Sequence, residues 1–123
     1  MFVASYEDRR HKLRPGKRDG AQRTGDSEIT ILVKGEEAML NFFKLDVGFD
    51  NPDDVQPFNE SIGYVISGKL EMRIGDELHI LGPGSAWVHP KGMRHTAKAL
   101  EPSTVLEFMA PVLDDVVRLF EES

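Results

Sequence analysis

The residues of this chain that could do chemistry lie between positions 48 and 99. The strongest candidate is His95, which follows a Pro-Lys-Gly turn, and polar side chains precede it at Asp54, Gln56 and Ser61. An imidazole changes its charge near neutral pH, so it can transfer a proton, anchor an acid or bind a metal ion. The chain has no cysteine, which excludes disulfide bonds, thiolate metal sites and thiol nucleophiles.

The alternation of residues around His95 predicts that its ring points inward. His95 shares one side of its strand with the small residues Ala97 and Ala99, whereas the charged Arg94 and Lys98 occupy the other side. Two alanines leave space beside the ring, so the pattern favours a histidine that lines a pocket. The alternative is a core histidine whose nitrogens are hydrogen-bonded to the backbone or to a neighbour.

Four further side chains are candidates for lining such a pocket. Trp87 and His89 share one side of a strand, and the tryptophan offers a flat surface to a ligand or to another subunit. His89 is placed either to reach the pocket mouth or to make a local hydrogen bond at its rim. Tyr64 is expected to help orient a ligand, and Glu107 to be either an inward carboxylate or an edge residue.

Length and composition place the chain among single-domain globular proteins. A chain of 123 residues suits one domain, which buries roughly two-thirds of its unfolded surface. No apolar run approaches the ~18 residues of a membrane-spanning helix, and the N-terminal residues lack the apolar core of a secretory signal. Together with the absence of cysteine, these features indicate a cytoplasmic protein.

The net charge of −6 is unevenly distributed along the chain. Residues 1–25 carry seven Lys and Arg against three Asp and Glu, so the remainder is strongly acidic. An acidic body argues against a nucleic-acid-binding surface. The basic segment is expected to lie on that body, to contact a partner or to remain solvated.

Turn signals divide the chain into three parts. Residues 1–27 lack periodicity and contain several glycine turns, which indicates an extended basic arm. Residues 28–110 alternate short apolar strands with turns, as is typical of an antiparallel sandwich or barrel, and the acidic segment 48–60 is predicted as a loop. In residues 111–123 the apolar side chains fall on one side of a helix. The predicted fold class is therefore all-β, with an N-terminal arm and a short C-terminal helix packed on the barrel.

Two spacings resemble the two motifs of the cupin superfamily. The first is G-x5-D-x-Q-x4-S-x6-G from Gly48 to Gly68, and the second is G-x5-P-x-G-x2-H from Gly84 to His95. The resemblance, which is to small single-domain bacterial members, implies a double-stranded β-helix, or jelly roll, around an internal pocket. It also implies a homodimer, which would help to cover exposed sheet edges.

Cupins that bind a metal commonly hold it with two histidines and a glutamate of the first motif and the histidine of the second. In this sequence those positions fall on Asp54, Gln56, Ser61 and His95. Amide and hydroxyl oxygens are weak ligands for zinc, iron, nickel or manganese, and the neighbouring Glu60 faces the opposite side of its strand. The resemblance therefore implies a degenerate metal site with no assigned cofactor, in which His95 holds at most a weakly bound divalent ion.

These observations favour a barrel that binds a small organic molecule, such as an acid or a sugar derivative, with His95 as its polar anchor. The other predicted ligand-binding residues are Gln56, Asp54, Tyr64, Trp87 and His89. The alternative is an isomerase or lyase for the same class of molecule, in which His95 is the general acid or base or holds a metal ion weakly. A third hypothesis is a regulatory or structural module whose basic arm contacts a partner.

Overall fold

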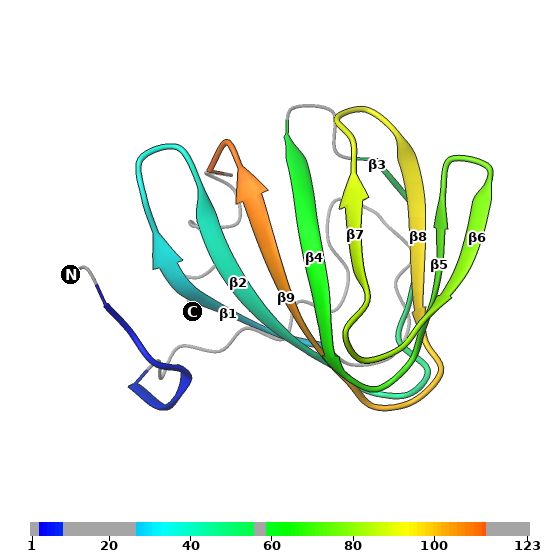
Figure 1. Cartoon of the computed structure of the whole chain (residues 1–123), viewed down its shortest axis with the longest axis horizontal. Helices are drawn as coiled ribbons and strands as arrows, with labels where there is room; N and C mark the ends of the chain where they lie inside the picture. The colour runs from blue at the N-terminus through cyan, green and yellow to red at the C-terminus, as the bar shows by residue number, and fades with distance from the viewer. Residues whose placement is uncertain (1–2, 9–26, 56–58, 113–123) are drawn as a thin grey trace.

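The structure, a computed structural model, describes residues 3–8, 27–55 and 59–112, with residues 8 and 52–55 described by their backbone alone. The described part consists of a short 3-10 helix and nine strands (Figure 1). The elements are η1 Tyr6–Asp8, β1 Ser27–Lys34, β2 Met39–Leu45, β3 Asp50–Val55, β4 Glu60–Ser67, β5 Leu70–Ile74, β6 Glu77–Leu81, β7 Ala86–His89, β8 Arg94–Ala99 and β9 Ser103–Ala110.

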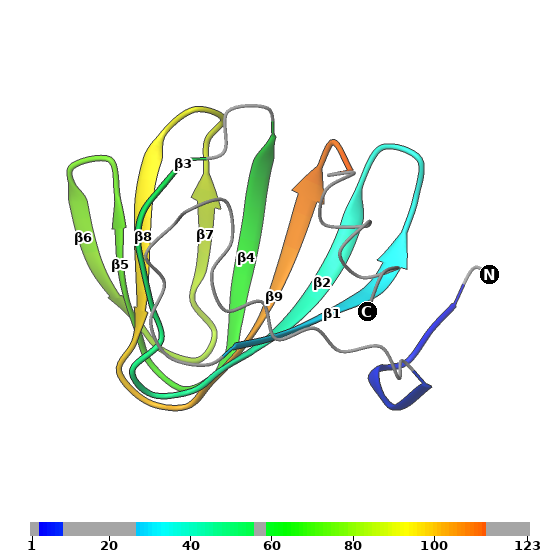
Figure 2. The same cartoon turned by 180° about the vertical axis from the view of Figure 1, so that it is seen from behind.

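The strands form two antiparallel sheets that face each other. The larger sheet has the order β1-β2-β9-β4-β7 and the smaller sheet the order β3-β8-β5-β6. Figures 1 and 2 show the strands of the two sheets converging at the lower end, with the β1–β2, β5–β6 and β7–β8 turns at the upper end. This arrangement confirms the predicted all-β jelly roll. Within the described part of the chain, no helix has the length and apolar character needed to cross a bilayer.

The ends of the predicted elements differ from the observed ones in two places. The loop predicted for residues 48–60 contains β3, in which Asn51 pairs with Ala97 and Asp54 with His95. Pro52 is compatible with this strand because β3 is the edge of its sheet and the ladder is irregular there. The predicted arm ends one residue earlier than expected, since β1 already includes Ser27. Most of that arm, and the predicted C-terminal helix from residue 113 onward, lie outside the described residues.

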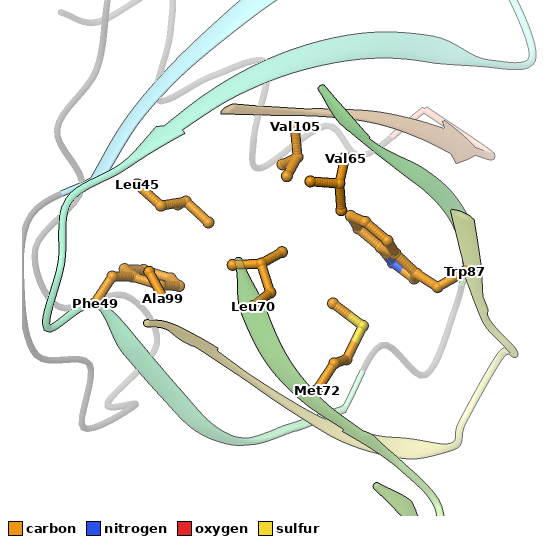
Figure 3. Packing of buried hydrophobic residues seen from close by; sticks show 8 residues of the cluster. All are labelled: Leu45, Phe49, Val65, Leu70, Met72, Trp87, Ala99 and Val105. Atoms are coloured by element: carbon orange, nitrogen blue, oxygen red, sulfur yellow. The ribbon is translucent and has the colours of Figure 1, made fainter. Parts of the chain in front are cut away.

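The main core lies between the sheets and is built from alternate residues of facing strands (Figure 3). Its buried members are Leu45, Phe49, Val65, Leu70, Met72, Trp87, Ala99 and Val105. Each large apolar side chain buried in this way contributes about 1.5–3 kcal/mol to folding. A second cluster of Ile31, Met39 and Met109 fills the space near β1 and β2, and Val112 packs against it.

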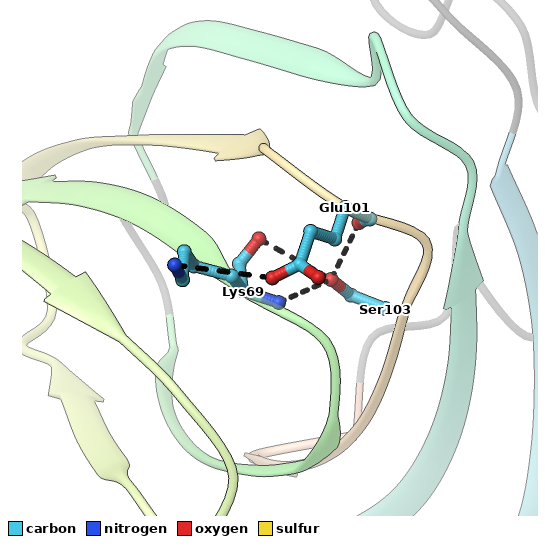
Figure 4. Close-up of polar contacts among 3 residues, drawn as sticks. All are labelled: Lys69, Glu101 and Ser103. Atoms are coloured by element: carbon cyan, nitrogen blue, oxygen red, sulfur yellow. Dashed lines mark hydrogen bonds and ion pairs between the residues drawn. The ribbon is translucent and has the colours of Figure 1, made fainter.

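A buried serine joins the turn after β4 to the loop after β8 (Figure 4). The backbone N–H of Lys69 donates to Ser103 Oγ at 3.1 Å, and the Ser103 hydroxyl donates to the Glu101 carbonyl at 2.8 Å. The exposed ion pair between Lys69 Nζ and Glu101 Oε2, at 4.0 Å, adds little because solvent screens it. Gly68 has a φ of 95°, and a Cβ at this position would overlap Ser103. The turn therefore requires a glycine next to this serine.

The inner face of β4 is formed by small residues over which the side chains of β7 lie. Gly63 pairs with Trp87 across the two strands, and the indole ring occupies the space that a Cβ at Gly63 would fill. The tryptophan is 8% exposed. Its place in the core thus depends on the absence of a side chain at position 63.

We expect Gly63→Ala to lower the free energy of unfolding by about 1–3 kcal/mol, because the added methyl group forces the Trp87 ring out of its site. Urea unfolding followed by circular dichroism measures this change. Gly82→Ala is the matched control, since a Cβ at Gly82 would meet no described atom within 4 Å. Equal stability of the two variants would contradict the close contact at Gly63.

Candidate functional site

A cavity of about 90 Å³ lies between the two sheets. Most of its wall is apolar and belongs to the main core, with the indole of Trp87 among the lining side chains. Its polar lining residues are Ser27, Asn51, His89, His95 and Glu107. A small number of polar groups in an apolar enclosure is the usual composition of a site for a small molecule.

Two imidazole rings stack inside this cavity. His89 comes from β7 of the larger sheet and His95 from β8 of the smaller sheet, so the stack bridges the two layers. The ring centroids are 3.7 Å apart and the ring planes differ by 11°. Both residues are 3% exposed. The inward position of His95 agrees with the orientation predicted from strand alternation.

Hydrogen bonds fix the orientation of each ring. His95 Nδ1 lies 3.4 Å from the Met93 carbonyl oxygen, which can only accept, so Nδ1 is the donor of this bond. His89 Nδ1 lies 3.3 Å from Ser61 Oγ, and either group can be the donor of this bond. Ser61 is completely buried and pairs with His89 across β4 and β7.

Trp87 forms a wall between the cavity and the outside. Its ring centroid is 5.9 Å from that of His89, at an angle of 41°. The same side chain also lines a surface cleft of about 560 Å³, which His79 of β6 and Val88 of β7 line as well. Its buried Nε1 has no hydrogen-bond acceptor among the described residues. Trp87 is thus the one described residue that lines both the cavity and the cleft.

The structure brings together only some of the side chains predicted to bind a ligand. Trp87, His89 and His95 line one cavity, and Glu107 lines it too, which decides between its two predicted positions. Tyr64 lies on the outer face of β4, is 47% exposed and does not line the cavity, in contrast to its predicted role. The reason is that β4 turns its small residues inward, as described above.

The two remaining predicted residues are described incompletely. Asp54 is opposite His95 in the β3–β8 ladder, and its side chain is outside the described part of the structure. Gln56 lies outside the described residues altogether. The sequence reasoning missed Asn51 and Ser27, which it had assigned to a loop and to the arm. The signal that could have placed Ser27 is the apolar alternation of β1, extended backwards by two residues from Ile29.

The described residues do not fit a resident metal ion. An imidazole binds a metal in the plane of its ring at about 2.0–2.1 Å. The nearly parallel planes of His89 and His95 do not meet near either ring, so the pair cannot share an ion in this arrangement. Ser61, at the position where metal-binding cupins have glutamate, contacts His89 instead. No group of three His, Asp or Glu side chains suited to a metal occurs among the described residues.

Comparisons with known proteins agree with this fold. The model of the cupin domain family matches residues 41–110. KdgF from Halomonas sp. is 32% identical with a TM-score of 0.70, over 73% of this chain and 84% of that chain. An RmlC-like cupin from Shewanella frigidimarina NCIMB 400 is 14% identical with a TM-score of 0.71, over 86% of this chain and 98% of that chain. Among curated proteins there is no match.

A third similar structure is that of a predicted oxalate decarboxylase from Thermotoga maritima. It is 14% identical with a TM-score of 0.73, over 91% of this chain and 99% of that chain. At this identity the similarity, like that to the Shewanella protein, concerns the fold alone.

We expect elemental analysis of the purified and dialysed protein to find well below one zinc, nickel, iron or manganese ion per chain. The physical reason is that the two cavity histidines do not converge on one point. His95→Ala serves as the comparison and should leave the metal content unchanged. A near-stoichiometric ion that His95→Ala removes would show that Asp54 or residues outside the described part complete a site.

Proposed function

The chain belongs to the cupin superfamily, and from this premise we propose that it binds a small organic acid in the cavity between its sheets. The observation that supports this most is the stacked pair of His89 and His95 on the wall of an otherwise largely apolar cavity. Ring N–H groups and a protonated imidazole are donors, so they favour an acceptor-rich ligand. A carboxylate is the simplest ligand with this property.

Charge considerations favour one negative group on the ligand. Two positive charges separated by the 3.7 Å between the rings would repel by about 4–5 kcal/mol at an effective dielectric constant of about 20. One negative group on a ligand is therefore a better match to the pair than two. A singly protonated pair gives a carboxylate a charge-assisted hydrogen bond, which is about twice as strong as a neutral one. His95 is the anchor, because the Met93 carbonyl helps to hold its ring in place on the wall of the cavity.

The size of the cavity limits the ligand. A void of about 150 Å³ in a protein core accommodates benzene, and this cavity of about 90 Å³ is smaller. Acids of a few carbon atoms therefore suit it better than whole sugars. Oxalate is a reasonable first probe because of its small size.

We expect His95→Gln to weaken binding of small acids by about tenfold or more, which corresponds to about 1.4 kcal/mol. Isothermal titration calorimetry with acetate, pyruvate, glycerate and oxalate measures the affinity. His79→Gln is the matched control, because His79 is exposed on β6 and does not line the cavity. Equal affinities of the wild type and His95→Gln would exclude the anchor role, and binding of none of the four acids would exclude the ligand class.

A second candidate function is that of an isomerase or lyase acting on the same class of molecule. The observation that favours it is that Glu107, on β9 of the larger sheet, and His95, on β8 of the smaller sheet, line the same cavity. A carboxylate and an imidazole on two sides of a substrate can act as base and acid in proton transfer next to a carbonyl group. This chemistry needs no metal ion.

We expect a catalytic protein to exchange the carbon-bound protons of pyruvate or a related oxo acid with heavy water, as proton NMR would detect. Glu107→Gln should slow this exchange by about 10²–10⁴-fold, the usual contribution of a general base. A chelator should leave the rate unchanged, and so should His79→Gln. No exchange above the buffer rate would leave the protein as a binder and exclude the enzyme hypothesis for these substrates.

A further inference from the structure

The strand β6 forms an open edge of the smaller sheet. It is the last strand in the order β3-β8-β5-β6, and Figures 1 and 2 show it at one end of the molecule. Among the described residues no other strand pairs with its far side. Edge strands commonly avoid pairing with other chains through a proline, a bulge or a lysine. β6 contains neither proline nor lysine and has a regular ladder with β5, so its edge is available for pairing.

The backbone of β6 presents hydrogen-bonding groups to this open side. The Gly75 N–H donates to the Arg94 carbonyl at 2.9 Å, so the odd-numbered residues of β5 bond toward β8 and the even-numbered ones toward β6. The partners of the even-numbered residues on β6 are Glu77, His79 and Leu81. These three direct their backbone groups to β5. Leu78 and Ile80, which alternate with them, each direct an N–H and a carbonyl away from the sheet.

The two faces of β6 differ in character. Its outer face carries Leu78 and Ile80, which are 52% and 57% exposed. Its inner face lines the surface cleft of about 560 Å³ with three side chains, those of Glu77, His79 and Leu81. Side chains directly opposite each other on neighbouring strands share a face of the sheet. A strand added to this edge therefore meets apolar side chains on one face and the cleft on the other.

The cleft is complementary to a long, positively charged side chain. Its ionisable lining residues are Asp76, Glu77 and His79, and no lysine or arginine is among the described residues that line it. The Glu77 side chain is 75% exposed, and its Oε2 lies 3.5 Å from His79 Nε2. Most of the other lining residues are apolar, with Leu81 and Trp87 among them. A lysine or arginine can lay its aliphatic stem along such walls and keep its charged end at the carboxylates.

We propose that the open edge of β6 binds an extended segment of a partner protein as an additional strand of the smaller sheet. In the bound segment, the residues opposite Leu78 and Ile80 are apolar and lie on the outer face. The residue opposite Glu77 is a lysine or arginine whose side chain enters the cleft. Backbone hydrogen bonds supply the affinity and the alternating side chains supply the specificity. The inference is independent of the proposed function, because the cavity histidines take no part in it.

The probe is the peptide acetyl-Lys-Val-Thr-Val-Lys-amide, whose two valines pair with Leu78 and Ile80 while one of its lysines reaches Glu77. We expect fluorescence anisotropy of the dye-labelled peptide to give a dissociation constant below about 1 mM. The control acetyl-Glu-Val-Thr-Val-Glu-amide should bind at least about tenfold more weakly, because its charge is reversed. No binding of the lysine peptide at about 1 mM would overturn the proposal. Equal affinity of the acidic peptide would do the same.

Backbone methylation of the peptide separates strand addition from charge attraction alone. The N–H groups of the two valines face β6, because they lie opposite the residues that direct their own groups outward. Methylating either valine nitrogen should therefore weaken binding by at least about tenfold. Methylation of the threonine nitrogen, which faces away from β6, is the matched control and should change the affinity by less than about threefold. Equal losses from the two kinds of methylation would contradict the pairing.

Two variants test the same contact from the protein side. Ile80→Pro removes an N–H that makes no bond to β5, so the ladder tolerates the change while peptide affinity should fall by at least about tenfold. Glu77→Lys should weaken binding to a similar extent through its charge. Its matched control is Glu36→Lys, in the exposed turn between β1 and β2. With folding checked by circular dichroism, unchanged affinity in either folded edge variant would overturn the proposal, and so would an equal loss in Glu36→Lys.

Hydrogen exchange followed by NMR adds a measurement on the wild type. In the free protein the amide protons of Leu78 and Ile80 should exchange faster than that of His79, whose N–H is bonded to β5. Saturating peptide should slow the exchange at Leu78 and Ile80 several-fold, and no change there would overturn the proposal. Protection of these two amides that grows with protein concentration in the absence of peptide would show that a second copy occupies the edge, and it would overturn the proposal as well.

Discussion

The interior of this protein depends on a match between small residues on one strand and large rings on its neighbour. On the inner face of β4 stand Ser61 and Gly63, and their partners on β7 are His89 and Trp87. Each ring lies over a small residue of β4 and occupies the space that a larger side chain at that position would fill. This match brings His89 across the gap to stack on His95, so that the two sheets meet through aromatic rings as well as through aliphatic packing.

The same match explains why the two histidines of the cavity, among the residues that the structure describes, do not converge on one point. A glutamate at position 61 would extend toward the middle of the barrel, where the His89 ring now lies. With a serine there, the hydroxyl hydrogen-bonds the ring and remains at the wall. The His89 ring thus contacts Ser61 on its own sheet and His95 on the facing sheet.

The fold and the inward direction of His95 could be predicted from the sequence. The buried side of a strand could not be predicted where it depends on the residues of a neighbouring strand. The alternation around His95 predicts its inward direction correctly, since charged residues occupy the other side of β8. On β4 the same rule gives the correct period of two but suggests the wrong buried side. Tyr64 and the isoleucines two positions before and after it form the more apolar set, and yet all three face outward. The side that a strand buries is decided here by the rings of β7, which are more than twenty positions away in the sequence. Likewise, β3 could not be predicted as a strand, because its proline and acidic residues are typical of a loop. Proline is tolerated in a strand at the edge of a sheet.

The position of Trp87 has a spectroscopic consequence. It is the single tryptophan of the chain, so the protein's indole emission comes from the wall of the cavity alone. A nearby imidazole quenches an indole more strongly when it is protonated, and the His89 ring centroid is 5.9 Å away. The native chain therefore contains its own optical reporter, whose brightness follows the charge of the histidine stack without any added label.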